Sequence, residues 1–429
     1  MRTHYSSEVS PEMDGEEVIV CGWVHDLRNL GGLIFLKIRD REGEIQVTAP
    51  KRKVDPETFE LISKLSIEDV VSVRGIVKRE DQAPRGLEII PLEVEVLNEV
   101  LGKLPLDPRG RVKAELDTRL DARVVDLRKR ENQAIFKLRS IVLRRIREFL
   151  YSKGFIEVNT PKIIAAATEG GTALFPVKYF ERNAFLSQSP QLYKQMLMGT
   201  GLDKVFEIAQ FFRAEEHDTR RHVNEFTSID IEMAFSKKED VMLILEELLR
   251  EVLSEVVKTE ELKELGIDEK DLDVEFPLPR IHYEEAIEML SEKGIEVEWG
   301  EDIPTKGLKE LWKLVGTKAY FIVDWPMSAK PFYIMPKGEL SESFDLMFYE
   351  IELASGGQRN HLYDSLVKAI RSKGLDPNDF SFYLDAFKWG MPPHSGWGLG
   401  LDRLMMALTG ADNIREVILF PRDRNRVIP

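Results

Sequence analysis

The hydrophobic period changes once along this chain, and that change limits the folds open to it. Between residues 18 and 97, apolar and polar side chains alternate in short runs separated by turn residues, which is typical of half-buried strands. From residue 131 the spacing becomes helical, with apolar side chains at Ile135, Leu138 and Val142. A chain of 429 residues with this break predicts two or three domains and ample material for a buried core.

The first part of the chain, residues 1–103, predicts a small five-stranded barrel. A short helix is expected after the third strand, with Asp55 as its N-cap and Pro56 as its first residue. This order is that of an OB-fold, whose strand 2–3 face binds single-stranded nucleic acid. The strands are expected near residues 18–24, 33–39, 44–49, 70–77 and 87–97.

One face of the expected second strand carries side chains suited to RNA. Phe35, Lys37 and Arg39 alternate with aliphatic residues and should point away from the barrel interior. An exposed aromatic ring beside cations can stack on a base and neutralise its phosphate. Gln46, on the outer face of the third strand, can both donate and accept hydrogen bonds. An ordinary solvated strand with one stray aromatic residue explains this segment equally well.

Composition excludes several classes of protein. Charged residues make up 31% and apolar residues 43% of the chain, so it should be globular rather than disordered. No apolar run approaches the ~20 residues of a membrane span, and the polar N-terminus predicts no export signal. The one cysteine, Cys21, allows neither an internal disulfide nor a multi-thiolate metal site. We therefore expect a cytoplasmic enzyme with no membrane association. Its net charge of −15 argues against indiscriminate binding to nucleic acid.

The remaining sequence predicts a hinge and a larger domain. Residues 104–130 are highly charged and contain two prolines, which indicates a hinge. Residues 131–429 form the larger domain, which begins with a helix that Gly154 is placed to end. Within it, residues 237–325 are expected to decorate the domain, and we assign them no chemistry.

Charged residues embedded in apolar strands indicate a binding pocket in this domain. Residues 205–212 and 225–235 predict two antiparallel strands joined by a loop rich in cations. Arg213, Phe226 and Asp230 should lie on or beside one face of that pair. They could hold a phosphate, a purine ring and an amine respectively. A solvated face explains the loop, but it does not explain charges inside apolar strands, where an unpaired charge is costly.

A glycine-rich stretch near the C-terminus adds to this pocket. Gly396, Gly398 and Gly400 alternate in a strand that runs directly into an amphipathic helix. They lack the spacing of a dinucleotide fingerprint, and alternate glycines in a strand suggest that a ligand approaches the backbone closely. Arg403 would project beside that ligand. Glu352 and Ser355 add oxygen ligands suited to magnesium that bridges phosphates.

These residues resemble the three motifs of class II aminoacyl-tRNA synthetases. Residues 131–161 resemble motif 1, Phe212-Arg-Ala-Glu215 with Phe226 and Asp230 resembles motif 2, and Gly396-x-Gly-x-Gly-x-x-Arg403 resembles motif 3. Gln188-Ser-Pro-Gln-Leu-Tyr-Lys194 and Ser355-Gly-Gly-Gln-Arg359 are similar to the shorter archaeal and eukaryotic type of aspartyl-tRNA synthetase. The resemblance covers essentially the whole chain. It implies an α+β domain built on an antiparallel sheet flanked by helices, and a homodimer formed through motif 1.

The resemblance also implies the chemistry and the nucleotide site. In this family the carboxylate of the amino acid attacks the α-phosphate of ATP, and the adenylate is then transferred to tRNA. Magnesium is the implied cofactor, linked to the positions of Asp345, Glu352 and Ser355, although Tyr349-Glu-Ile351 departs from the family's usual Arg-Gly. Arg213 and Arg403 are the implied catalytic residues. The implied ATP site comprises Arg213, Glu215, Arg221, His222, Phe226, Glu352, Gly400 and Arg403.

Two further sites follow from the same resemblance. Lys194 and Arg359 match positions that read the side-chain carboxylate of L-aspartate, and asparaginyl enzymes typically lack the lysine. The implied aspartate site comprises Glu169, Ser189, Gln191, Lys194, Asp230, Ser355 and Arg359. The implied anticodon contacts are His25, Phe35, Gln46, Pro84 and Glu93.

The anticodon positions bear on which tRNA is accepted. Archaeal members that reject the asparagine anticodon GUU have Trp and Lys at the positions of His25 and Pro84. The family pattern therefore implies that this chain charges both tRNA(Asp) and tRNA(Asn). The alternatives are a strictly discriminating aspartyl enzyme, an asparaginyl enzyme, a stand-alone relative that makes free asparagine, and a non-catalytic RNA-binding paralogue.

Overall fold

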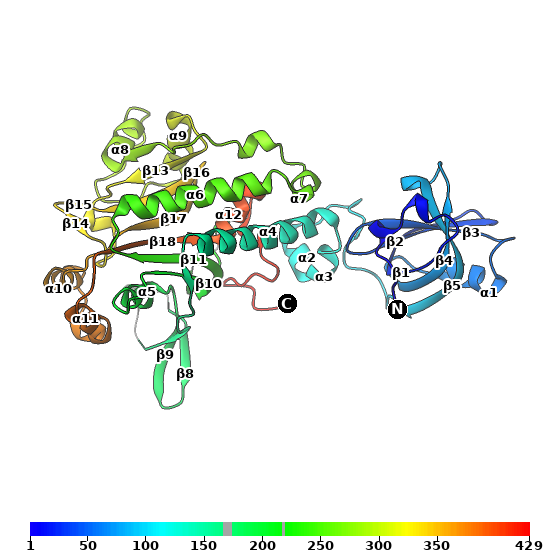
Figure 1. Cartoon of the computed structure of the whole chain (residues 1–429), viewed down its shortest axis with the longest axis horizontal. Coiled ribbons are helices and arrows are strands. Elements are labelled where there is room, and N and C mark those ends of the chain that lie inside the picture. Colours follow the sequence, from blue (N-terminus) through cyan, green and yellow to red (C-terminus); the bar gives the residue numbers. More distant parts are fainter. Residues whose placement is uncertain (166–173, 217–218) are drawn as a thin grey trace. The chain divides into compact units, whose positions relative to one another are not determined.

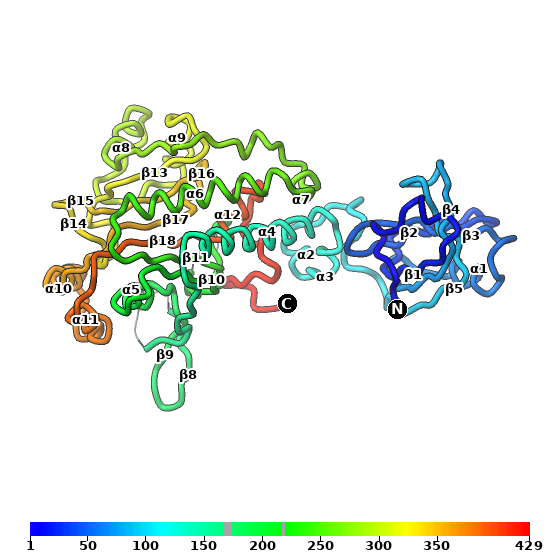
Figure 2. Tube along the Cα trace, viewed as in Figure 1, coloured from blue at the N-terminus to red at the C-terminus, as the bar shows by residue number. Residues whose placement is uncertain are grey.

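The computed structural model describes residues 1–165, 174–216 and 219–429. By its internal contacts the chain divides into two compact units, residues 1–129 and 130–429, and each has its own hydrophobic core. The Cα trace shows both units, with the first in blue to cyan colours (Figure 2). Within the described residues, no helix is both long and apolar enough to cross a membrane.

The first unit contains the predicted OB-fold, a closed barrel with strand order β1-β2-β3-β5-β4 (Figure 1). Helix α1 lies between β3 and β4, and the Asp55 carboxylate caps it by accepting hydrogen bonds from the backbone N–H groups of Glu57 and Thr58. The prediction of five strands and one inserted helix is therefore confirmed. The elements are β1 (Glu17–Asn29), β2 (Leu33–Arg39), β3 (Glu44–Pro50), α1 (Pro56–Lys64), β4 (Val70–Arg79) and β5 (Leu87–Asn98).

One residue of β2, Arg39, differs from the prediction in its exposure to solvent. Arg39 is buried, and its guanidinium Nη2 lies 2.8 Å from Oε2 of the equally buried Glu68. The prediction that Arg39 is an exposed cation beside Phe35 is therefore wrong: Arg39 is covered by its contacts with Glu68 and His25, and pairing with the buried Glu68 carboxylate offsets a charge that would be costly alone. The exposed cation in register with Phe35 is instead Arg28 of β1.

The end of the first unit is helical. Two short helices, α2 (Leu116–Asp121) and α3 (Arg123–Asp126), lie within the segment predicted to be a hinge. Arg123 and Asp126 are both buried, and their side chains pair at 2.7 Å. This ion pair links the two ends of α3.

The second unit is built on an eight-stranded sheet with order β12-β13-β16-β17-β18-β11-β10-β6. Its central pairings are antiparallel and its two edge pairings are parallel, so the predicted antiparallel sheet with flanking helices is confirmed. Helices α4 and α6 run side by side across one face (Figure 1). The bounds are α4 (Arg130–Ser152), β6 (Ile156–Glu157), β7 (Ile163–Ile164), β8 (Pro176–Tyr179), β9 (Arg182–Leu186), α5 (Gln191–Met198), β10 (Lys204–Phe212), β11 (Glu225–Ala234), α6 (Lys238–Val256), α7 (Glu260–Glu264), β12 (Arg280–His282), α8 (Tyr283–Ser291), α9 (Thr305–Val315), β13 (Ala319–Val323), β14 (Pro336–Lys337), β15 (Leu340–Ser341), β16 (Ser343–Phe348), β17 (Ile351–Gln358), α10 (Tyr363–Ser372), α11 (Ser381–Lys388), β18 (His394–Gly400) and α12 (Leu401–Thr409).

Residues 237–325 are part of the core architecture. The sequence predicts decoration there, but the segment supplies α6, which packs on the sheet, and the sheet strands β12 and β13. Every residue of β13 is buried, so its sequence is a short continuous apolar run. Such a run shows no alternation, and periodicity alone cannot distinguish it from a buried helix segment.

The two faces of the central strands have different roles. Ile229 and Ile231 of β11, with Trp397 and Leu399 of β18, join the main hydrophobic core. The Trp397 indole N–H donates a hydrogen bond to the Val241 carbonyl of α6, which fixes that face against the helices. Since successive side chains of a strand point to opposite faces, the polar residues between them face away from α6.

Candidate active site

The polar face of the central strands lines a cavity of about 490 Å³. Strands β11, β17 and β18 form its floor, and its wall includes the start of α12, the chain after β10 and residues 330–334. The lining combines arginines, carboxylates and a single phenylalanine ring, Phe226, with the glycines Gly398 and Gly400. A cavity with this composition can hold a ligand that carries several charges.

The cavity brings together nearly all of the residues predicted for the larger domain. Lys194 and Asp345 lie outside the lining, and Glu169 lies outside the described residues. The predicted residues that line it are Ser189, Gln191, Arg213, Glu215, Arg221, His222, Phe226, Asp230, Glu352, Ser355, Arg359, Gly400 and Arg403.

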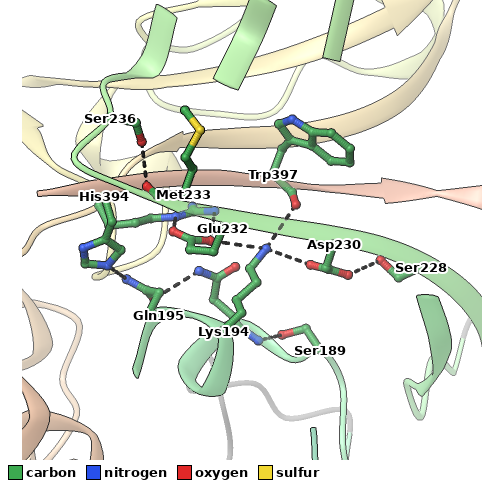
Figure 3. A network of polar contacts seen from close by, with 12 residues as sticks. Ser189, Lys194, Gln195, Ser228, Asp230, Glu232, Met233, Ser236, His394 and Trp397 are labelled. Atoms are coloured by element: carbon green, nitrogen blue, oxygen red, sulfur yellow. Dashed lines mark hydrogen bonds and ion pairs between the residues drawn. The ribbon is translucent and has the colours of Figure 1, made fainter. Parts of the chain in front are cut away.

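Two buried cations and two buried carboxylates form a network at one end of the cavity. Lys194 Nζ donates to Asp230 Oδ1 at 2.8 Å and lies 3.6 Å from Glu232 Oε2 (Figure 3). Arg359 Nε and Nη2 donate to the two oxygens of Glu232 at 2.9 and 3.2 Å. Ser228 Oγ donates to the second oxygen of Asp230 at 2.6 Å. The four formal charges cancel, which makes their burial tolerable.

The pKa shifts in this network follow from its geometry. Burial raises the pKa of the Glu232 carboxyl, but the attraction of Arg359 and Lys194 outweighs burial and leaves it below its usual value. Burial lowers the pKa of Arg359, and the adjacent Glu232 reverses this effect and raises it. Both partners are therefore charged at neutral pH, and Arg359 lines the cavity as a guanidinium.

The alternate glycines of β18 make room for these carboxylates. Asp230 pairs in register with Gly398, and Glu232 pairs with Gly396. A Cβ atom on Gly396 would lie 2.2 Å from Glu232 Oε2, and one on Gly398 would lie 3.0 Å from Asp230 Oδ1. The sequence predicts that a ligand approaches the strand here. In the structure, the side chains of β11 already occupy the space over Gly396.

We expect Gly396→Ala to destabilise the chain by about 1–3 kcal/mol, because the added methyl group collides with both the Glu232 carboxylate and the Ile231 carbonyl. The midpoint of denaturant unfolding measures this. Gly400→Ala is the matched control, since a Cβ atom there meets nothing closer than 3.7 Å. Equal midpoints for the two variants would contradict this account of β18.

A histidine lies behind the network. His394 is fully buried, its Nδ1 lies 2.8 Å from the Pro392 carbonyl, and its Nε2 lies 3.1 Å from the Gln195 amide nitrogen. Burial lowers the pKa of His394 to about 4. The ring is therefore neutral, with Nδ1 as donor and Nε2 as acceptor.

His394 should make the stability of the chain depend on pH. The unfolded chain takes up a proton near pH 6.5, whereas the folded chain does so only near pH 4. Between these values the unfolded state binds more protons, so the free energy of unfolding falls as the pH falls, by about 3 kcal/mol in total. We expect His394→Gln to remove this part of the dependence. Unfolding curves at pH 7 and pH 4.5 measure it, and an unchanged difference in the variant would contradict the assignment.

The other end of the cavity is suited to a nucleotide. The Arg213 guanidinium carbon lies 5.2 Å from the centroid of the Phe226 ring, which is within cation–π range. Arg403 Nη1 donates to the Glu352 carbonyl at 3.2 Å. The pKa of His222 is lowered by burial and then by the nearby Arg403. Several cations thus converge on a cavity that also offers the aromatic face of Phe226.

Two lining cations are held by carboxylates that the sequence-based prediction did not pair with them. Arg221 Nη2 donates to Glu350 Oε1 at 3.0 Å, and Glu350 is the residue that departs from the family pattern. Lys330 Nζ lies 2.8 and 3.0 Å from the two oxygens of Asp345. No pattern in the sequence links Arg221 to Glu350 or Lys330 to Asp345. The sequence showed only that Glu350 departs from the family pattern.

Of the three residues predicted to bind magnesium, only Glu352 and Ser355 line the cavity. Asp345 is buried beneath Lys330, and burial raises the pKa of its carboxyl despite that neighbour. Among the described residues, no group of three His, Cys, Asp or Glu side chains is arranged to hold a metal. Because Mg²⁺ usually binds through one or two carboxylates plus substrate phosphates, Glu352 and Ser355 suit an ion that arrives with its ligand.

Only some of the predicted anticodon contacts lie together on the barrel. Gln46 and Pro84 line a shallow depression with Lys37 and Glu44, while Phe35 stays half-buried on β2. His25 lies beside the same group, with its Nε2 3.1 Å from Glu44 Oε1, and burial lowers its pKa. Glu93 lies on β5 and pairs with Arg74 of β4, outside that depression.

Comparisons with known families cover both units. Residues 115–424 match the model of the tRNA synthetases class II (D, K and N). Residues 18–97 match the model of the OB-fold nucleic acid binding domain. Together the two matches account for nearly the whole chain.

Similar full-length proteins have also been described. The chain is 56% identical to an aspartate–tRNA(Asp/Asn) ligase of Methanopyrus kandleri, with full coverage of both chains. It is 57% identical to an aspartate–tRNA(Asp) ligase of Pyrococcus abyssi, again over the full length of both. A solved structure of asparaginyl-tRNA synthetase from Pyrococcus horikoshii, complexed with asparaginyl-adenylate, superposes with a TM-score of 0.94 at 36% identity and full coverage.

Proposed function

Since the chain belongs to the class II tRNA synthetases, we propose that it attaches L-aspartate to tRNA through an aspartyl-adenylate. The observation that carries this proposal is the buried network of Lys194 and Arg359 at one end of a cavity whose other end is lined by Arg213, Arg403 and Phe226. An acidic amino acid and a triphosphate can meet in such a cavity. Relatives more than 50% identical over the full length carry names that agree with this activity.

The first step needs alignment and charge stabilisation more than proton transfer. The aspartate α-carboxylate is nucleophilic at neutral pH, and it displaces pyrophosphate from the α-phosphate of ATP. Arg213 would hold the α-phosphate and Arg403 the γ-phosphate, while adenine rests on Phe226. Fixed cations stabilise the charge that develops in the transition state, and a bound geometry replaces a bimolecular encounter. Magnesium, held by Glu352 and Ser355 with the phosphates, would offset further negative charge.

Selection of aspartate over asparagine would rest on cationic hydrogen-bond donors. Arginine and lysine side chains have donors and no acceptors. Lys194 and Arg359 already pair with Asp230 and Glu232, so selection would come from charge: a bound carboxylate adds charge-assisted hydrogen bonds to these cations, and a neutral amide forms weaker ones. The Asp230 carboxylate would take the α-amino group, together with Gln191. This separates the proposal from an asparaginyl activity, although the superposed Pyrococcus horikoshii structure is an asparaginyl enzyme.

The barrel would read the anticodon through Phe35 and Gln46, with His25 and Pro84 near the third base. Two relatives of nearly equal identity carry different names, one for tRNA(Asp) alone and one for both tRNAs. Overall identity therefore does not distinguish the two specificities, and the assignment rests on His25 and Pro84. We propose that the chain charges both tRNA(Asp) and tRNA(Asn), acts as a homodimer and works in the cytoplasm.

Aminoacylation of two transcripts tests this function. We expect purified chain with ATP, magnesium and aspartate to charge a tRNA transcript with a GUC anticodon and one with GUU, at rates that differ by no more than about 150-fold, because one lost base contact costs about 1–3 kcal/mol. If only the GUC transcript is charged, the chain is an aspartyl enzyme that accepts tRNA(Asp) alone. Charging of neither transcript, or charging with asparagine, would overturn the proposal.

A further inference from the structure

The barrel has a second cationic surface, apart from the predicted anticodon contacts. Lys51, Arg52 and Lys53 are consecutive and exposed, and they form the turn that joins β3 to α1. We call this segment the 51–53 turn. Within residues 1–129, all of which the structure describes, none of the three forms an ion pair with a carboxylate.

Several other cations of the barrel have their charge offset locally, although the exposed Arg28 of β1 has no carboxylate partner among residues 1–129. Lys64 pairs with Glu60 at 2.6 Å, Arg74 with Glu93 at 3.0 Å, and Arg79 with Asp81 at 3.7 Å. In a chain with a net charge of −15, three adjacent cations without such partners stand out as local positive charge. The positive electrostatic potential of this turn can therefore attract a negatively charged ligand.

The backbone of the turn is held in place. The Lys51 N–H donates to the Gly32 carbonyl at 3.0 Å, and the Lys53 N–H donates to the Pro50 carbonyl at 2.9 Å. Val54, the next residue, is buried in the barrel core. The nearest carboxylate in sequence, Asp55, accepts two backbone hydrogen bonds as the cap of α1. A turn fixed in this way loses little backbone freedom when a ligand binds.

The strand register places the turn beside the base-stacking residue. Phe35 of β2 pairs with Thr48 of β3, and Lys51 follows three residues later, so about 10 Å of strand separates them. The β1–β2 loop, joined to the turn through Gly32, is also open, because a Cβ atom on Gly31 or Gly32 would meet nothing within 4 Å. An OB-fold typically covers about 4–16 nucleotides, which is ample to span both features.

We propose that the 51–53 turn binds phosphates of the tRNA backbone next to the base that Phe35 stacks. Lysine and arginine contacts to phosphates position an RNA without reading its sequence. The turn would therefore add affinity equally for cognate and altered anticodons, while the β2–β3 face supplies the discrimination. This inference rests on the proposed function, since it takes tRNA as the ligand.

The test uses Arg52→Gln/Lys53→Gln in the full chain. Lys51 is kept because its Nζ lies 5.8 Å from the centroid of the Phe59 ring, so its replacement could disturb α1. We expect the Kd for a GUC transcript to rise about tenfold at low salt. We also expect the slope of log K against log salt to become shallower by about 1.4–1.8, the value for two phosphate contacts. A transcript with a changed anticodon should lose the same factor.

Lys64→Gln/Arg79→Gln is the matched control, since it removes the same charge from the same barrel at cations that already have carboxylate partners. It should leave affinity and slope close to wild type. Equal slopes for the two double variants, in a chain that charges the wild-type transcript, would overturn this inference alone. A wild-type chain that attaches no aspartate to the transcript would overturn the proposed function instead.

Discussion

Lys194→Leu and Arg359→Leu, made separately, should each lower aspartate-dependent exchange of pyrophosphate into ATP by about 10⁴-fold. Each cation is buried, and each forms hydrogen bonds with a carboxylate that stays behind when the cation is removed. The variant site would then present uncompensated negative charge to a substrate that carries negative charge itself. The initial rate of exchange at saturating ATP measures the effect.

Loss of fold must be separated from loss of recognition. Lys238→Leu is a matched control, because Lys238 is also a buried lysine, yet its carboxylate partners Asp324 and Glu342 do not line the cavity, whereas Asp230, the partner of Lys194, does. It should lower the unfolding midpoint but keep exchange at temperatures below that midpoint. If Lys238→Leu loses exchange to the same degree while still folded, or if Lys194→Leu retains it, the proposed aspartate site is wrong.

Arg213→Met should lower kcat for exchange by about 10²–10³-fold, because the α-phosphate would lose a fixed cation in the transition state. The loss of the contact with Phe226 should also raise the KM for ATP. Arg220→Met serves as the control on the same segment, since Arg220 is exposed and does not line the cavity. Equal kcat and KM for the two variants would show that Arg213 has no role in the reaction.

Local patterns in the sequence were enough to predict the barrel and part of the cavity, and the family resemblance supplied most of the other lining residues. Asp55 and Pro56 mark the start of α1, and strict alternation marks β2, because these signals act within a few residues. The residues around Arg213 and Arg403 were found because they lie in short motifs that the fold then brings together.

What the sequence did not predict depends on partners distant in the chain. Arg39 is buried by its pairing with Glu68, which lies 29 residues away, and no pattern within β2 indicates that contact. Glu232 follows Asp230 on the same strand face, yet its role became visible only when Arg359, 127 residues later, was placed beside it. Lys330 and Asp345 likewise meet across separate segments. A buried charge needs an oppositely charged partner, and that partner can come from any segment that the fold brings close. The sequence therefore indicates that a partner exists but does not identify it.

Pyrophosphate exchange with two amino acids tests the central claim most directly. The wild-type chain, with ATP and magnesium but without tRNA, is given either aspartate or asparagine at the same concentration. We predict rapid exchange with aspartate and a rate at least about 10³-fold lower with asparagine, because a neutral amide forms weaker hydrogen bonds with the cations of Lys194 and Arg359 than a carboxylate does. Comparable exchange with asparagine, or none with aspartate, would contradict the account.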